Sequence, residues 1–192
     1  MAIRLIVGLG NPGPEYEHTR HNVGAVFVER AAKHFDIGLD LTPRFYGFVG
    51  RGFIGEQDVR LLVPTTFMNR SGQAVNAVAG FFKIALEEIL VVHDEVAFEP
   101  GIARIKQGGG DNGHNGLKDI VRGLGNHSEF LRLRIGVGHP GDKNLVAAFL
   151  TGRRMPTSER ELIEAAFEKS LHVVPEIVRG EIAQAMNRLH AD

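Results

Sequence analysis

The sequence predicts a single α/β domain, and three observations lead to this fold class. A chain of 192 residues that is 43% hydrophobic fits one domain with a substantial core. A first apolar run, at residues 5–7, leads through a polar loop into a segment with helical periodicity. A second apolar run, at residues 89–92, is rich in β-branched side chains, as expected for a strand that is buried on both faces.

Composition excludes several kinds of site. The chain has no cysteine, which rules out disulfides, a thiolate nucleophile and a cysteine metal site. Its N-terminal apolar run is too short for a signal peptide, and no later run is long enough to span a bilayer, so we expect a cytoplasmic protein without a membrane partner. The net charge of −1 gives no global basic surface, so any contact with nucleic acid must come from a local patch.

The connection after the first strand carries a glycine pattern. The glycines within residues 8–13 match G-x-G-x-x-G, but Pro12 and Pro14 lack the backbone N–H groups that a phosphate cradle needs. These glycines are therefore interpreted as turn residues. The first helix is predicted to begin near Asn22, an N-cap residue type, and to end before residue 38.

The same connection presents Asn11, Tyr16 and His21. A strand-to-helix connection is the usual place for a site in an α/β sheet. The alternative is that Asn11 only shapes a turn and His21 only caps the helix. Either role is common for one such residue alone.

Residues 45–63 predict a β-hairpin. Two apolar segments are separated by a polar turn at residues 55–58, and Pro64 follows as a strand end.

The next loop leads to a second helix, for which Ser71 is the expected N-cap. Phe67 and Met68 are most simply core anchors of this loop, and Asn69 is most simply a turn residue.

His93, Asp94 and Glu95 stand at the end of the strand at residues 89–92. Histidine and acids can bind a metal, yet one tripeptide supplies no recognised ligand spacing. The favoured interpretation is therefore a carboxylate that orients a catalytic histidine.

Residues 102–107 predict a strand, and residues 108–116 then contain five glycines in nine residues. Such a loop allows the backbone to approach a bulky ligand closely, and it presents Asn115 near the start of a third helix. A flexible connector is the alternative, but the interleaved histidine and asparagine residues favour a binding loop.

A further strand at residues 130–138 carries Arg132 and Arg134 on one face. A solvated edge strand explains two such arginines equally well.

Two helical segments follow. Residues 142–150 predict a short helix over the site, which makes this segment a candidate lid. Residues 157–189 predict a C-terminal helical region that Pro175 and Gly180 kink or interrupt.

Five motifs together resemble the bacterial-type peptidyl-tRNA hydrolase family: GLGNPGPEYEHTRHNVG, TTFMNRSGQAV, VVHDE, GGGDNGHNGLKD and LRIGVGHPGDKN. They occur in the family's order over nearly the whole chain. The resemblance implies a twisted mixed β-sheet surrounded by α-helices in one domain. It also implies a monomeric enzyme, without metal or cofactor, that hydrolyses the ester between a peptide and the terminal ribose of tRNA.

The resemblance also implies roles for residues. His21 resembles the catalytic base, Asp94 the carboxylate that orients it, and Asn11 the position that helps to separate blocked from free aminoacyl-tRNA. The positions that resemble the family's tRNA contacts are Tyr16, Phe67, Asn69 and Asn115 at the 3′ end, with Met68 and His114 beside them, and Lys106 and Arg134 at phosphate.

The chemistry of the chain agrees with these roles. Without cysteine or a G-x-S-x-G motif, an activated water is the natural nucleophile. A histidine with a pKa of about 6.5 can accept its proton, and a carboxylate fixes the imidazole tautomer. The amide of Asn11, Asn69 or Asn115 could stabilise the oxyanion, and the sequence does not choose among them.

The chain departs from the family pattern at Asp111-Asn112, where His-Gly is usual, and at Ala25 and Ala97. Asp111 adds negative charge to a loop that should approach RNA, which predicts weaker tRNA affinity. Because the chain offers few cationic contacts, its affinity for tRNA should fall only shallowly as the salt concentration rises. The slope should correspond to about 2 to 4 neutralised phosphates.

Three other functions remain as alternatives. They are a non-catalytic RNA-binding relative, which would not need both His21 and Asp94, a nicotinamide-dependent oxidoreductase, and a metallohydrolase that a chelator would inactivate.

Overall fold

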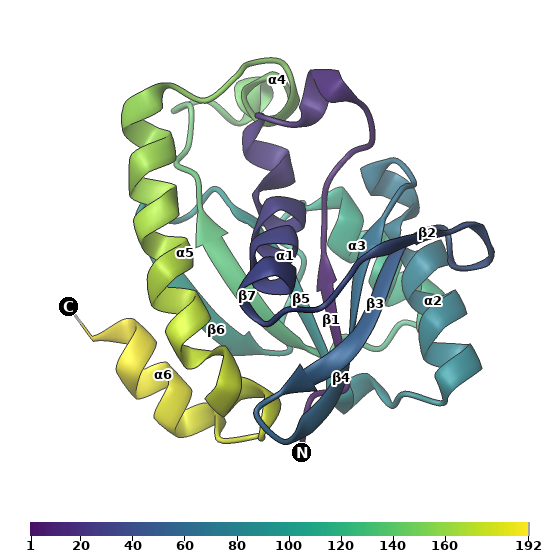
Figure 1. Cartoon of the computed structure of the whole chain (residues 1–192). Coiled ribbons are helices and arrows are strands. Elements are labelled where there is room, and N and C mark those ends of the chain that lie inside the picture. Colours follow the sequence, from purple (N-terminus) through teal and green to yellow (C-terminus); the bar gives the residue numbers. More distant parts are fainter. Residues whose placement is uncertain (192) are drawn as a thin grey trace.

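A computed structural model describes residues 1–191. Within that range seven strands form one twisted mixed sheet in the order β2-β3-β4-β1-β5-β7-β6, and helices cover both of its faces (Figure 1). This confirms the predicted α/β fold class. The strands are β1 (Leu5–Gly8), β2 (Asp40–Thr42), β3 (Gly47–Ile54), β4 (Gln57–Pro64), β5 (Ile89–Glu95), β6 (Ala103–Gln107) and β7 (Leu131–Gly136).

The helices fall into two layers and one short cap. One layer packs on the sheet through α1 (Val23–His34), α5 (Thr157–Val178) and α6 (Ile182–His190). The other layer contains α2 (Ser71–Phe82) and α3 (Asn115–Gly123). The short helix α4 (Val146–Thr151) lies beside the connection that follows β1, at the top of Figure 1.

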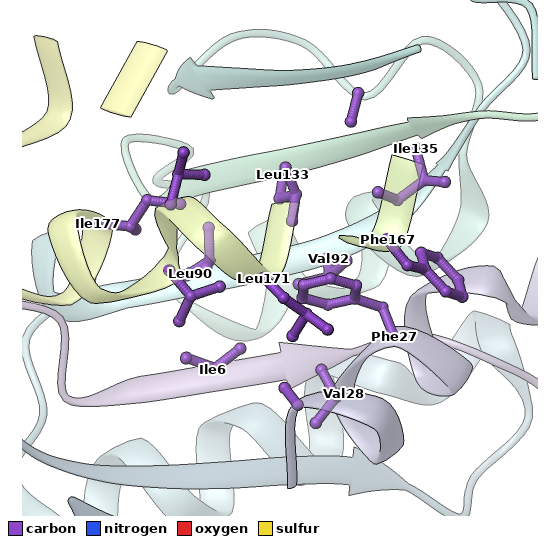
Figure 2. Packing of buried hydrophobic residues seen from close by; sticks show 14 of the residues in the cluster. Ile6, Phe27, Val28, Leu90, Val92, Leu133, Ile135, Phe167, Leu171 and Ile177 are labelled. Atoms are coloured by element: carbon purple, nitrogen blue, oxygen red, sulfur yellow. The ribbon is translucent and has the colours of Figure 1, made fainter. Parts of the chain in front are cut away.

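Successive side chains of the central strands point to opposite faces of the sheet and contribute to two hydrophobic cores. Leu5 belongs to the core under α2 and α3, whereas its neighbour Ile6 points into the core under α1 and α5. Ile6 and Leu90 of the sheet share this core with Phe27 of α1 and Phe167 of α5, and in Figure 2 Phe27 lies between the two strand residues and Phe167. The two aromatic rings meet edge to face with centroids 5.4 Å apart. Burial on both faces explains the continuous apolar run of β5.

Strands β1, β5 and β7 run in parallel, so their carboxyl ends meet at one edge of the sheet. Gly8 is paired with Val92, and β5 continues beyond this pair to Glu95. The connection after β1 and the end of β5 are therefore neighbours, which is the arrangement that the candidate site requires.

Glycines allow α1 to approach the sheet closely. A Cβ atom at Gly8 would lie 2.4 Å from the carbonyl oxygen of Gly24, and one at Gly24 would lie 2.2 Å from that of Val92. Among the glycines of residues 8–13, only Gly13 has a positive φ, of 108°. The interpretation of all of them as turn residues was therefore wrong, because Gly8 serves helix packing.

Sequence patterns predicted the hairpin better than the C-terminal helices. Ile54 pairs with Gln57 across a short turn, which confirms the hairpin. Helix α5, in contrast, continues through Pro175 to Val178, and the break comes at Gly180, where φ is 84°. One lost backbone hydrogen bond at Pro175 is offset because the surrounding turn is buried in the core. Among residues 1–191, no helix is both long and apolar enough to cross a bilayer.

Candidate active site

His21 and Asp94 meet at the carboxyl edge of the sheet. His21 lies in a short 3₁₀ turn, Arg20–Asn22, just before α1, and Asp94 is the penultimate residue of β5. The Nδ1 atom of His21 is 2.7 Å from Oδ2 of Asp94, and the two residues are only 6% and 3% exposed. Because Nδ1 faces the carboxylate, Nε2 is the ring nitrogen of His21 that is left to act as a base.

His114 is the second imidazole on Asp94. Its Nε2 atom lies 2.8 Å from Oδ1 of Asp94. Its Nδ1 atom accepts hydrogen bonds from the amides of Gly116 (3.1 Å) and Leu117 (3.3 Å), which makes His114 the N-cap of α3. An acceptor role for Nδ1 places the hydrogen of the neutral ring on Nε2, where it is donated to Asp94. Sequence reasoning had grouped His114 only with the tRNA contacts.

Burial and the neighbouring groups shift the pKa values of Asp94, His21 and His93. Burial alone would raise the pKa of Asp94, but electrostatic attraction and hydrogen bonds from the His21 and His114 rings outweigh it and hold that pKa far below its usual range. Burial would likewise lower the pKa of His21, yet the Asp94 carboxylate raises it on balance. Burial, together with the neighbouring His114, lowers the pKa of His93 to about 3, so His93 is neutral. Asp94 is therefore the fixed anion of the site.

Asn11 is held by both its backbone and its side chain. Its backbone N–H and carbonyl bond the side chain of Asn22, at 2.8 and 2.9 Å. Its Oδ1 atom accepts a hydrogen bond of 2.7 Å from the amide of Met68. The NH₂ group of Asn11 is therefore the end that can donate to a ligand. Asn22 precedes α1 as predicted, but its side chain braces Asn11 and makes no cap hydrogen bond among the described residues.

His21, Asp94 and His114 are also the residues that could hold a metal ion, since one donor atom from each lies within 4.8 Å of the others. Two donors on a tetrahedral zinc ion lie about 3.3 Å apart. The contacts of Asp94 with the two imidazoles, at 2.7 and 2.8 Å, are shorter than this. The observed spacing is that of hydrogen bonds, and a metal would have to displace both.

Partly or fully exposed side chains, here called the rim, lie next along the chain to the buried groups Met68 and His114 and in the connection after β1. The rings of Tyr16 and Phe67 meet edge to face with centroids 6.4 Å apart, and Phe67 is 56% exposed. Asn69 and Asn115 are also exposed, the latter as the first residue of α3. The structure therefore brings together the aromatic residues predicted to contact the tRNA 3′ end.

Met68, in contrast, is a core residue. It is 4% exposed and belongs to the core under α2 and α3. Its carbonyl accepts a hydrogen bond of 2.7 Å from the hydroxyl of Ser71, which is the first residue of α2 and not its N-cap as expected. Met68 thus positions Asn11 through its backbone while its side chain packs inside.

Four cations share one face of the β6–β7 ladder. Arg132 pairs with Lys106 and Arg134 with Arg104, so their side chains project from the same side of the sheet. The solvated-edge interpretation was wrong, because β7 is an inner strand and Arg132 is 2% exposed. Arg104 was missed, because only strand pairing places it beside Arg134.

A cavity of about 350 Å³ opens on this cationic face. Its lining includes Lys106, Arg132 and Arg134 and also the acids Glu95 and Asp111. Arg132 donates to the carbonyls of Gly109 and Gly110, so it ties the glycine-rich loop to the sheet.

The glycine-rich loop also bonds to the end of β5. Asn112 donates a hydrogen bond of 2.9 Å to Glu95 from a backbone with a φ of 49°, in the left-handed region. Asp111 accepts a hydrogen bond of 2.9 Å from the amide of Gly113. The two residues that depart from the family pattern therefore shape the loop that delivers His114.

Helix α4 borders a smaller cavity beside Asp94. A cavity of about 40 Å³ is lined by Val146 and Leu150 of α4 together with Asp94, His114 and their neighbours. This segment coincides with the predicted short helix over the site, and its function as a moving lid stays a prediction.

Comparison with known proteins gives a consistent result. The profile of the family described as Peptidyl-tRNA hydrolase matches residues 5–192. Proteins named peptidyl-tRNA hydrolase from Azotobacter vinelandii and Pseudomonas aeruginosa are 55% and 53% identical to this chain, covering 99% of it and 97% of each relative. A crystal structure of peptidyl-tRNA hydrolase from Acinetobacter baumannii has 49% identity and a TM-score of 0.95, and the match covers 98% of this chain and 95% of that one.

Proposed function

The chain belongs to the peptidyl-tRNA hydrolase family, and on that basis we propose that it cleaves the ester between a peptide and the 3′-terminal ribose of tRNA with a water activated by His21. The observation that carries this proposal is the hydrogen bond of 2.7 Å between His21 and the buried carboxylate of Asp94. It leaves Nε2 of His21 as a base that is already oriented.

Hydrolysis then needs one proton transfer in each direction. His21 Nε2 removes a proton from water as the oxygen attacks the ester carbonyl, and Asp94 stabilises the imidazolium that forms. The C–O bond to the ribose breaks, and the imidazolium returns the proton to the leaving ribose oxygen. The hydrogen bond from His114 to Asp94 keeps the carboxylate in place throughout.

Asn11 is the best-supported donor to the oxyanion. The Met68 amide fixes the oxygen of its side chain, so the NH₂ group keeps one orientation without reorganising. Asn69 and Asn115 are exposed and are better suited to contact the terminal nucleotides.

The rim and the cationic face provide the tRNA site in this proposal. Tyr16 and Phe67 offer aromatic faces to the terminal base or ribose. Lys106 and Arg134 would contact phosphate beside the cavity of about 350 Å³. One chain supplies all of these groups, so the proposed site needs no second subunit, and the monomeric state stays a prediction.

The test compares N-acetyl-aminoacyl-tRNA with the same tRNA carrying a free amino acid, with EDTA present. Wild type is compared with His21→Ala and with His172→Ala, which removes an exposed histidine of α5 that bonds only its own helix backbone among the described residues. We expect fast release of tRNA from the blocked substrate by wild type and His172→Ala and near-complete loss in His21→Ala.

Three outcomes would contradict the proposal. Loss of wild-type activity in EDTA would indicate a metal at His21, Asp94 and His114. Full activity of His21→Ala would exclude it as the base. Binding of tRNA without cleavage by wild type would favour the RNA-binding alternative.

A further inference from the structure

Arg20 is a buried arginine that directly precedes the proposed base. It is 5% exposed and lies in the same 3₁₀ turn as His21. Arginine is almost never buried unless its charge is paired, because removing a guanidinium from water is unfavourable. The partners of Arg20 therefore indicate why it lies there.

The guanidinium of Arg20 joins three segments that are far apart in the sequence. Its Nη2 atom forms an ion pair of 2.5 Å with Glu159, in the first turn of α5. Its Nη1 atom donates to the carbonyl oxygen of Phe149 in α4, at 3.3 Å. Its Cζ atom also lies 3.9 Å from the centre of the Phe149 ring, in cation–π geometry.

Helix α4 has little burial of its own. None of its described residues, Val146–Thr151, is buried. Val146 and Leu150 face the small cavity beside Asp94 and His114, while Phe149 faces Arg20. A helix of this length with so little apolar burial is a low-stability element unless other contacts hold it.

The backbone around Arg20 is connected to the same region. Thr19 forms a β-bridge with Arg154, and the amide of Met155 donates a 3.1 Å hydrogen bond to the carbonyl of His18. The residues just before the turn that carries His21 are thus bonded to the residues that follow α4.

We propose that Arg20 is a positioning residue that holds α4 over Asp94 and His114 and, through the same contacts, fixes the turn that carries His21. The stack on Phe149 holds the helix, and the ion pair with Glu159 anchors the guanidinium to the long helix α5. A substitution that makes α4 more mobile should therefore also make the turn that carries His21 more mobile. The kinetic part of this inference rests on the proposed role of His21.

The chain provides a matched control. Arg30 of α1 also pairs with a glutamate of α5, Glu164, but both side chains are 44% exposed. An exposed pair of this kind contributes little. Arg30→Lys should therefore change neither the rate of hydrolysis nor the mobility of α4.

The experiment uses Arg20→Lys, Phe149→Leu and the double variant in the full chain. Lysine retains the charge that pairs with Glu159, but it loses the planar stack on Phe149. Leucine retains apolar volume and the backbone carbonyl but removes the aromatic face. Steady-state hydrolysis of N-acetyl-aminoacyl-tRNA gives kcat and KM, and hydrogen exchange by mass spectrometry follows the peptide that covers residues 143–152.

We expect Arg20→Lys to lower kcat about tenfold while KM stays within about twofold, because Phe67 and Asn69 lie on a different loop. Exchange in residues 143–152 should become about tenfold faster. Phe149→Leu should act in the same direction, and the double variant should be no worse than Arg20→Lys alone, since both changes break one contact.

Unchanged exchange in Arg20→Lys, an unchanged kcat, or effects that multiply in the double variant would each overturn the inference. A wild-type protein that cleaves no blocked aminoacyl-tRNA would instead overturn the proposed function. The exchange data and their non-additivity would still test whether Arg20 holds α4. If Arg20→Lys fails to fold, Phe149→Leu alone decides through the same two measurements.

Discussion

The buried cluster and the exposed rim of the site differ in how their side chains are held. His21, Asp94 and His114 are fixed by hydrogen bonds of 2.7 and 2.8 Å in the protein interior. Phe67 and Asn69 stand at the surface, and Phe67 is 56% exposed. Under the proposed function, the groups that act on the ester shared by all substrates are fixed before binding, whereas the groups that meet a flexible RNA end can adjust to it. Substitutions in the two regions should therefore have different kinetic signatures.

The largest effect is expected from Asp94→Asn. The amide occupies the same volume but cannot accept hydrogen bonds from both imidazoles, so the orientation of His21 is lost. We expect kcat to fall by about 10³- to 10⁴-fold, as for the equivalent change in a histidine–aspartate pair. Initial rates of tRNA release measure this. Asp58→Asn, in the exposed pair with Arg51, is the control, and a tenfold loss or less in Asp94→Asn would show that the cluster is not the centre of the chemistry.

The pH dependence of kcat/KM should separate two effects of Asp94, the orientation of His21 and the effect of its charge on the pKa of His21. Because Asp94 raises the pKa of His21, kcat/KM of wild type should fall as the pH drops through that raised value, where the base becomes protonated. In Asp94→Asn the raising charge is gone and burial remains, so the acid limb of the residual activity should move to lower pH. If the acid limb of Asp94→Asn lay at the same pH as that of wild type, the limb would not report the protonation of His21.

The pKa of Asp94 shifts in the opposite direction to that of His21, and the stability that Asp94 contributes should also be lost in acid. The pKa of Asp94 is depressed in the folded state, so its contribution is present above the unfolded value of about 3.9 and is lost as the pH falls toward the folded value. The difference in melting temperature between wild type and Asp94→Asn should therefore shrink in acid. A constant difference from pH 7 to pH 3 would argue against the charge as its cause.

His114 should show an intermediate effect, because it both caps α3 and donates to Asp94. His114→Ala removes both roles, and we expect about 10- to 100-fold lower kcat and about 1 kcal/mol lower stability. His114→Asn can still cap the helix, so it should recover stability without recovering activity. Equal recovery of both would mean that capping alone explains the residue.

Residue patterns were sufficient to place His21 and Asp94 but not His114. A polar connection after β1 and a polar triplet at the end of β5 predict proximity because parallel strands end at the same sheet edge. The approach of His114 to Asp94 depends on the conformation of the glycine-rich loop, in which Asn112 and Gly113 have positive φ. Hydrophobic periodicity in the sequence does not predict the conformation of such a loop.

Burial was the other quantity that the sequence could not supply. Arg132 and Arg134 alternate in β7 as they would in an edge strand, and only the antiparallel addition of β6 makes that strand internal. Gly8 matches a nucleotide-binding pattern, yet it is needed because α1 packs against it. In both cases a partner from elsewhere in the chain decides the role.

The rim should affect binding more than catalysis. Phe67→Ala removes an exposed ring next to Tyr16, and we expect KM to rise about tenfold with little change in kcat. Phe53→Ala is the matched control, since Phe53 is 62% exposed but lies next to the hairpin turn of β3 and β4. If kcat fell more than KM rose, Phe67 would belong with the buried cluster.

The smallest effect is expected at the cationic face, where Asp111 is a negative charge beside positively charged side chains. Its carboxylate lies beside Arg132 in the cavity of about 350 Å³ and accepts a hydrogen bond of 2.9 Å from Gly113. Asp111→Asn can retain that bond while it removes the charge, so it tests affinity more cleanly than a change to the histidine that is usual in the family.

We expect Asp111→Asn to lower KM for N-acetyl-aminoacyl-tRNA about 2- to 3-fold at low salt, because exposed charge interactions are modest. The gain should vanish near 1 M salt, where the Debye length is about 3 Å. Asp142→Asn is the control, since Asp142 bonds the amide of Asn144 in the same way outside this cavity. An unchanged or higher KM at low salt would mean that phosphate does not approach Arg132 and Arg134, and the tRNA path would then have to avoid the β6–β7 face.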